Sequence, residues 1–156
     1  MQPFPLRPPR DVHPATGDVA PGIEELAELH TRLVDTVDGF EKMIEKATPE
    51  LAPIARDFHA LHGAHARAIA GMLSQDGHDP AQDGSIFGAV NRGLVAARAW
   101  FDDVGLNLME PLIQGEKHVL DAYDAAIDSA ADFARREALE AMRARQIELM
   151  DRHLHI

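Results

Sequence analysis

The 156-residue chain contains no cysteine. Without thiols it can form neither a disulfide framework nor a thiolate metal site, and cysteine nucleophilic catalysis is excluded. A chain without disulfides suits a reducing compartment, so we expect a cytoplasmic protein.

The chain also lacks an excess of positive charge and any long apolar run. It has 15 basic and 26 acidic side chains, which gives a formal net charge of -11. Such a chain repels phosphate backbones and anionic lipid surfaces, so we expect no nucleic acid and no membrane as partner. No segment reaches the roughly 18 apolar residues of a membrane span, and the N-terminus lacks the apolar core of a signal peptide.

Aromatic residues make up only 5% of the chain, whereas hydrophobic residues make up 46%. Many of these are Ala and Leu, β-branched runs are few, and Glu and Arg are frequent, which favours an all-α protein. The length fits one domain, which we place at 22–156. Residues 1–21 are rich in proline and form an arm. This arm is either a disordered tail or a packing segment across a partner subunit, with Phe4 and Leu6 as apolar anchors.

Apolar residues recur at helical spacing in five segments. These segments are 22–48, 49–76, a shorter one near 86–103, 106–128 and 132–155. The four long segments have the proportions of a four-helix bundle made of two hairpins. The shorter helix belongs to the long connection between the two hairpins, which could run the length of the bundle.

Several polar residues fall on the apolar faces of these helices. His62 and His65 lie inside the apolar stripe of the second helix, whereas His59 lies at its edge. Glu116 is centred on the core face of the fourth segment, where a buried carboxylate needs a partner. Counting residues from the two hairpin turns brings two further positions, Gln146 and His30, to the same mid-bundle depth, so one buried polar centre is predicted. Its candidate members are His62, His65, Glu116, Gln146 and, at the margin of the first helix, His30.

Five short motifs resemble the ferritin-like superfamily, in particular a bacterial branch described as a domain of unknown function. They are "VDGFEKM", "GHDP", "GSIFGAVNRG", "GEKHVLDAYDAAI" and "RQIELMDRH". The resemblance implies a ferritin-like four-helix bundle and brings no established activity.

Ferritin-like iron sites use Glu-x-x-His motifs and further Glu or Gln residues on the bundle helices, and this resemblance suggests a metal site. Here His62 and His65 stand in place of Glu-x-x-His, with Glu116 on the third bundle helix and Gln146 on the last. His30 is nearest to the position of the first-helix Glu. One carboxylate cannot balance two iron ions, so a single transition metal, Zn or Fe, fits better than a di-iron centre.

Two interpretations stay open at this stage. The polar centre either binds one metal ion or is a hydrogen-bonded network without metal that fixes the register of the helices. Correspondingly, the chain is either a metal-binding protein or a non-enzymatic helical module for oligomerisation or stress-related interaction, which associates through Trp100, Phe101 and the arm. A homo-oligomer, most simply a dimer, is expected in both cases, and the sequence assigns no reaction and no catalytic residue.

Overall fold

The structure, a computed structural model, describes residues 20–80 and 108–156. Within these ranges the chain forms four α-helices and no strand. They are α1 (Ile23–Lys46), α2 (Leu51–Gln75), α4 (Met109–Asp128) and α5 (Phe133–Leu154). The predicted all-α architecture of four long helices is therefore confirmed. The shorter helix near 86–103, Trp100, Phe101 and nearly all of the arm lie outside the described residues.

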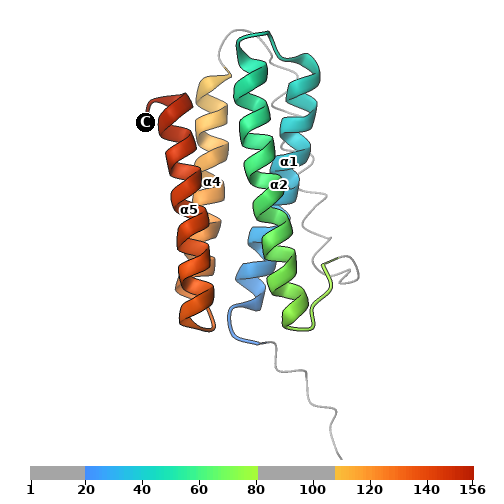
Figure 1. The fold of residues 1–156 in the computed structure, drawn as a ribbon, viewed down its shortest axis with the longest axis vertical. Coiled ribbons are helices and arrows are strands. Elements are labelled where there is room, and N and C mark those ends of the chain that lie inside the picture. The colour runs from blue at the N-terminus through green and yellow to red at the C-terminus, as the bar shows by residue number, and fades with distance from the viewer. Residues whose placement is uncertain (1–19, 81–107) are drawn as a thin grey trace, which may run out of the picture.

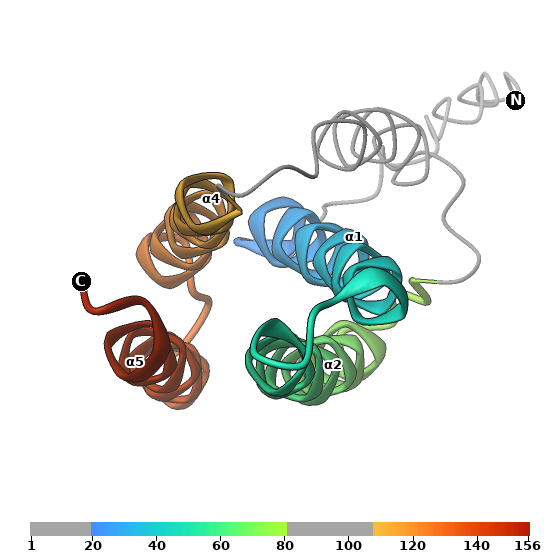
Figure 2. The same cartoon turned by 90° about the horizontal axis from the view of Figure 1, so that it is seen from above.

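The helices form two antiparallel hairpins packed side by side, α1 with α2 and α4 with α5 (Figures 1 and 2). In Figure 1, α1 rises and α2 descends, while α4 descends and α5 rises to the C-terminus. The end of α2 and the start of α4 therefore lie at opposite ends of the bundle, and these two helices run parallel. None of the helices in the described ranges is long and apolar enough to cross a membrane.

Local sequence signals explain several helix ends. Asp132 caps α5, because its side chain accepts a hydrogen bond from the backbone N–H of Arg135 at 2.8 Å. The hydroxyl of Thr48 accepts from the N–H of Leu51 at 3.4 Å, and α2 begins at Leu51, two residues after the predicted start at residue 49. After α2 the chain turns through Gly77, whose φ of 78° is readily adopted only by glycine.

Gly22 is required where α1 begins. Its φ is 79°, and a Cβ atom at this position would lie 2.2 Å from the backbone oxygen of Ser129. Any side chain here would collide with the turn that follows α4. The absence of a side chain thus lets the start of α1 pack against the end of α4.

The core consists of two apolar clusters separated by a polar layer. The first cluster is Ile23, Leu26, Ala27, Leu29, Leu33, Ala66, Ile69, Leu73, Val119, Tyr123, Ala126, Ile127 and Leu139. The second is Phe40, Met43, Ala55, Phe58, Leu112, Leu149, Met150 and Leu154. The polar layer lies between them along α2, α4 and α5 and contains His62, His65, Glu116 and Gln146.

Candidate functional site

The centre of the polar layer is the contact between His62 of α2 and Glu116 of α4. The exposed fraction of His62 is 0% and that of Glu116 is 1%. The Nε2 atom of His62 lies 3.1 Å from both carboxylate oxygens of Glu116. Because a carboxylate at such a depth is costly unless it is paired, this contact supplies the partner that Glu116 requires.

Gln146 of α5 completes this half of the layer. Its side-chain Nε2 donates to the Glu116 carboxylate at 2.7 Å and to the Glu116 backbone carbonyl at 3.1 Å. The amide therefore ties α5 to α4, while the imidazole ties α2 to α4. Three helices meet at one buried carboxylate, as the depth count predicted for Gln146.

His65 lies one helical turn beyond His62 and has a different partner. It is 4% exposed, and its Nδ1 atom lies 2.7 Å from the hydroxyl of Tyr123. Burial, reinforced by His62 and Arg145, lowers the pKa of His65 from 6.5 to about 4, so the ring is neutral near pH 7. Burial and the nearby Glu116 raise the pKa of Tyr123 far above its ordinary value, which keeps the phenol protonated.

Aromatic rings surround the two histidines unequally. The ring of His62 stacks on Phe40 and on Phe58, with ring centroids 5.8 and 6.1 Å apart. The ring of His65 instead meets Tyr123 edge-on, with centroids 6.1 Å apart. His62 is thus held on the side of the second apolar cluster and His65 on the side of the first.

Three polar atoms of the layer are buried without a hydrogen-bond partner. They are Nδ1 of His62, Nε2 of His65 and Oε1 of Gln146. Buried polar groups in native proteins are nearly always paired with protein, water or an ion, and an unpaired one costs about 1–3 kcal/mol. The layer therefore has unused hydrogen-bonding and ligating capacity.

The structure places the sequence candidates as follows. His62, Glu116 and Gln146 are in direct contact, and His65 is buried beside them, so the predicted inward orientation of both histidines is confirmed. His59 is half-buried, at the margin, as predicted. His30 is half-buried too, with a pKa lowered by burial, and no hydrogen bond among the described residues joins it to the layer. Within residues 20–80 and 108–156, no group of three or more His, Asp or Glu side chains is arranged to hold a metal ion.

Sequence reasoning missed two contacts that join α2 to α5. Arg135 binds Asp76 at 2.7 Å near one end of the bundle, and His153 lies 2.9 Å from Asp57 near the other. The partners are 59 and 96 residues apart in the sequence. Opposite charge on two helices was the only signal available, and it does not specify which residues pair.

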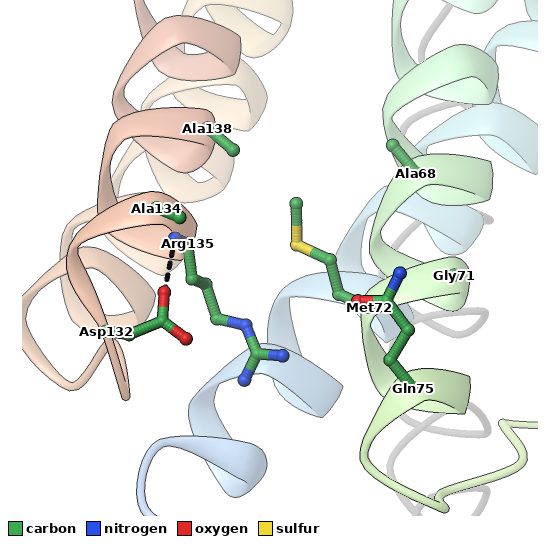
Figure 3. A pocket seen from close by; sticks show the side chains of 8 residues that line it. All are labelled: Ala68, Gly71, Met72, Gln75, Asp132, Ala134, Arg135 and Ala138. Carbon is green, nitrogen blue, oxygen red and sulfur yellow. Dashed lines mark hydrogen bonds between the residues drawn. The ribbon is translucent and has the colours of Figure 1, made fainter.

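Between α2 and α5, next to the Arg135 contact, lies an open groove of about 390 Å³ (Figure 3). Its walls are mostly small side chains. The lining residues are Ala68, Gly71, Met72, Gln75, Asp132, Ala134, Arg135 and Ala138. Ala68 lies three residues from His65 on the same helix, so the groove ends about one turn from the polar layer.

Fold and site together define a helical bundle with a buried His–Glu–Gln centre between two apolar clusters. Residues 22–129 match the family described as Domain of unknown function (DUF2383). The match covers more than half of the chain, and the chain belongs to this family. No curated protein and no solved structure matches it.

Proposed function

We propose that the chain is a ferritin-like bundle that binds one divalent transition-metal ion between His62 and Glu116, with Gln146 as a further ligand. Zinc and iron are the metals whose ligand preferences fit imidazole, carboxylate and amide oxygen. When bound, the metal would supply Lewis acidity or, in the case of iron, redox chemistry.

The helix directions support the ferritin-like part of this proposal. Two antiparallel hairpins in which α2 and α4 run parallel need one long connection between these two helices, which is the arrangement of ferritin-like bundles. The 33 residues between Gln75 and Met109 are ample for such a crossover.

The distances around Glu116 support the metal part. Two atoms that bind the same ion at about 2.0–2.2 Å lie roughly 3 Å apart when they occupy adjacent positions. Nε2 of His62 is 3.1 Å from each oxygen of Glu116. The spacing therefore suits a metal ion that takes the place of the proton on Nε2.

The observation that carries the proposal is the buried Oε1 atom of Gln146, a proposed ligand atom that lacks a hydrogen-bond partner. A polar layer that served only to fix helix register should have all its members satisfied, because a half-satisfied network is less favourable than an apolar core. Oε1 and Nε2 of an amide exchange by rotation, so Gln146 can turn its oxygen towards an ion at Glu116.

These residues fit one ion and not two. Ferritin-like di-iron centres use four carboxylates, with two histidines, to hold the two metals. The polar layer contains one carboxylate, Glu116. We therefore derive no di-iron chemistry for this chain.

The test is metal binding by the full chain with two matched variants. Wild type should bind close to one equivalent of Co²⁺ or Zn²⁺ and gain thermal stability from it, because an ion that binds only the folded state stabilises it. Glu116→Gln removes the charge at constant shape and should abolish both effects. Glu110→Gln makes the same change on the same helix at an exposed position, so binding should be unchanged. Wild-type protein that takes up no metal after refolding in its presence would refute the proposal.

A second candidate function is self-association without metal, favoured by the direct His62–Glu116 hydrogen bonds and by Phe133, which is 78% exposed. An exposed aromatic side chain is typical of an interaction surface. Under this alternative Glu116→Gln alters stability only. Sedimentation of the full chain should give at least twice the mass of one chain, and deletion of residues 1–20 should lower that mass if the arm packs on a neighbour. A monomer at all concentrations would exclude it.

A further inference from the structure

The groove between α2 and α5 leaves apolar surface uncovered on both helices. Ala68 and Gly71 of α2 and Ala134 of α5 are exposed, and they line the groove together with the half-buried Met72 (Figure 3). Their small side chains leave about 390 Å³ of open space between the two helices. An apolar groove with a polar rim is typical of a surface on which another segment packs.

The rim of the groove has both a hydrogen-bond donor and a negative charge to offer. The side-chain amide of Gln75 is exposed and forms no hydrogen bond within residues 20–80 and 108–156. Asp132 contributes an exposed carboxylate, whereas Arg135 is already paired with Asp76. Such a rim suits a segment that brings positive charge and unpaired backbone carbonyls, and a polyproline II chain has no internal hydrogen bonds to use those carbonyls.

The sequence "FPLRPPR" at residues 4–10 has these properties. Its three prolines favour the extended polyproline II conformation and so lower the entropy lost on docking. Phe4 and Leu6 supply the apolar side chains. The α2 wall of the groove, from Ala68 to Gln75, is about 10 Å long, which three to four residues span at about 3.1 Å each.

We infer that residues 4–10 dock in the groove between α2 and α5 of their own chain. Phe4 and Leu6 pack on Met72 and the alanine walls, and the two arginines of the segment lie at the acidic rim. The docked segment is an interaction within the chain that does not depend on the proposed metal site.

The position of the start of α1 supports this assignment. A Cβ atom on Gly22 would lie 2.2 Å from the backbone oxygen of Ser129, so the chain that precedes α1 begins beside the turn between α4 and α5. Only three residues separate Ser129 from Asp132 at the rim, at most about 11 Å of chain. Residues 11–19 alone can extend over roughly 28 Å at about 3.1 Å each, so residues 4–10 can reach the groove.

Charge favours the chain's own arm over a second copy as the occupant. Residues 1–10 contain two arginines and no acidic residue, so they carry +2, and the rest of the chain carries -13 because the whole carries -11. The end of the bundle that bears the groove is acidic as well, since four aspartates belong to it against two arginines. These are Asp76, Asp79, Asp128 and Asp132 against Arg135 and Arg136. Two copies of -11 repel each other, whereas the arm is attracted to the bundle.

The first experiment locates the docked segment in the full chain with ¹³C-labelled methyl groups of Ala and Met. Phe4→Ala removes an aromatic ring and should shift the methyl signals of Met72 and Ala138, because a ring displaces the signals of methyl groups packed on it. The methyl signal of Met43, in the second apolar cluster, should not move. Val12→Ala removes an apolar side chain of the arm outside the docked segment and should leave all these signals in place. Unchanged signals of Met72 and Ala138 in Phe4→Ala would overturn the inference.

The second experiment decides which chain supplies the segment. A chain labelled both at Met methyl groups and at Phe rings should show a nuclear Overhauser effect between Phe4 and Met72. A mixture of chains labelled at Met with chains labelled at Phe should show none, because there only contacts between two chains are detected. A signal of full strength in the mixture would assign the groove to a second copy and overturn docking within one chain.

The third experiment measures the rate at which trypsin cleaves the bond after Arg10, since a docked backbone resists proteolysis. Ala68→Leu narrows the groove at an exposed position and should raise this rate several-fold. Ala125→Leu makes the same change at an exposed position of α4 and should leave the rate at that of wild type. Equal rates in the two variants would overturn the inference, and circular dichroism shows that both have kept their helices.

Discussion

The two halves of the bundle core hold their histidines in different ways. In one half His62 packs on two aromatic rings, Phe40 and Phe58, and contacts a carboxylate. In the other half His65 contacts the phenol of Tyr123, a member of the first apolar cluster. The two residues are identical, buried, and one turn apart on the same helix. Their chemistry differs because α4 presents Glu116 to one and Tyr123 to the other.

This comparison shows that a histidine pair at i, i+3 is not a functional unit by itself. His62 faces an acceptor, so its Nε2 either carries a proton or binds a metal in its place. His65 instead faces a phenol, whose hydroxyl can donate to Nδ1 or accept from it, depending on the tautomer of the ring. The partners on α4 thus place the two imidazoles in different hydrogen bonds.

The largest expected effect comes from removing the ring of Phe58, on which His62 packs. Phe58 is fully buried and stacks on Phe40 with ring centroids 5.5 Å apart, so Phe58→Ala should lower the free energy of unfolding by about 4 kcal/mol. Urea unfolding measures this. Phe133→Ala removes the same ring from a side chain that is 78% exposed and should cost less than about 0.5 kcal/mol. Similar losses in the two variants would contradict the described core.

The second-largest expected effect comes from removing His62, the imidazole partner of the Glu116 carboxylate. His62→Leu leaves Glu116 with Gln146 as its remaining side-chain partner, which should cost about 3 kcal/mol of unfolding free energy, measured with a chelator present. His118→Leu, on the exposed face of α4, should cost less than about 0.5 kcal/mol. If His62→Leu were as stable as wild type, Glu116 would not depend on this imidazole.

On the His65 side the expected loss is smaller, because only one neutral hydrogen bond is removed. Tyr123→Phe keeps the ring and its edge contact and should cost about 1.5 kcal/mol. A double-mutant cycle with His65→Leu isolates the pair and should give a coupling of about 1 kcal/mol. A coupling near zero would mean that the short contact contributes nothing to stability.

The last expected effect is a change in the pH dependence of stability. The pKa of His65 is about 4 in the folded chain and near 6.5 when unfolded. Between these values the unfolded chain binds the extra proton, so this residue makes unfolding easier as the pH falls from 6.5 towards 4. His65→Gln should therefore lose less stability than wild type between pH 7 and pH 5.

The contribution of His65 to the pH dependence of stability has to be measured by comparing wild type with His65→Gln, because other groups titrate in the same range. Burial and neighbouring acids raise the pKa of Asp35 to about 6, so the folded chain binds this proton first and Asp35 favours folding as the pH falls. Asp35 is present in both proteins, and its contribution cancels in the comparison. A pH dependence that is identical in wild type and His65→Gln would show that the buried ring is not the group that titrates.

Helical periodicity alone was sufficient to predict which residues of each helix face the core. Apolar spacing determines which side of a helix is buried, so His62, His65, Glu116 and Gln146 could be placed in the core from the sequence, and His59 at its margin. Counting back from the turn that contains Ser129 also paired Glu116 with Gln146, since both residues belong to one hairpin with a short loop. The same apolar spacing located the ends of the four described helices to within about three residues.

What the sequence could not determine is which histidine meets which partner. A shift of one turn, about 5.4 Å, between α2 and α4 would bring His65 to Glu116 instead, with almost no change in the pattern of buried residues on either helix. No short loop joins these two helices, so their relative height is decided by how the two apolar clusters pack across the whole bundle. The same packing leaves His30 outside the hydrogen bonds of the polar layer and brings Tyr123 to His65. The sequence by itself therefore determined the helices and the residues that face inward, through local periodicity. Only the tertiary structure decided the roles of the two histidines, because those depend on contacts between residues more than 50 positions apart.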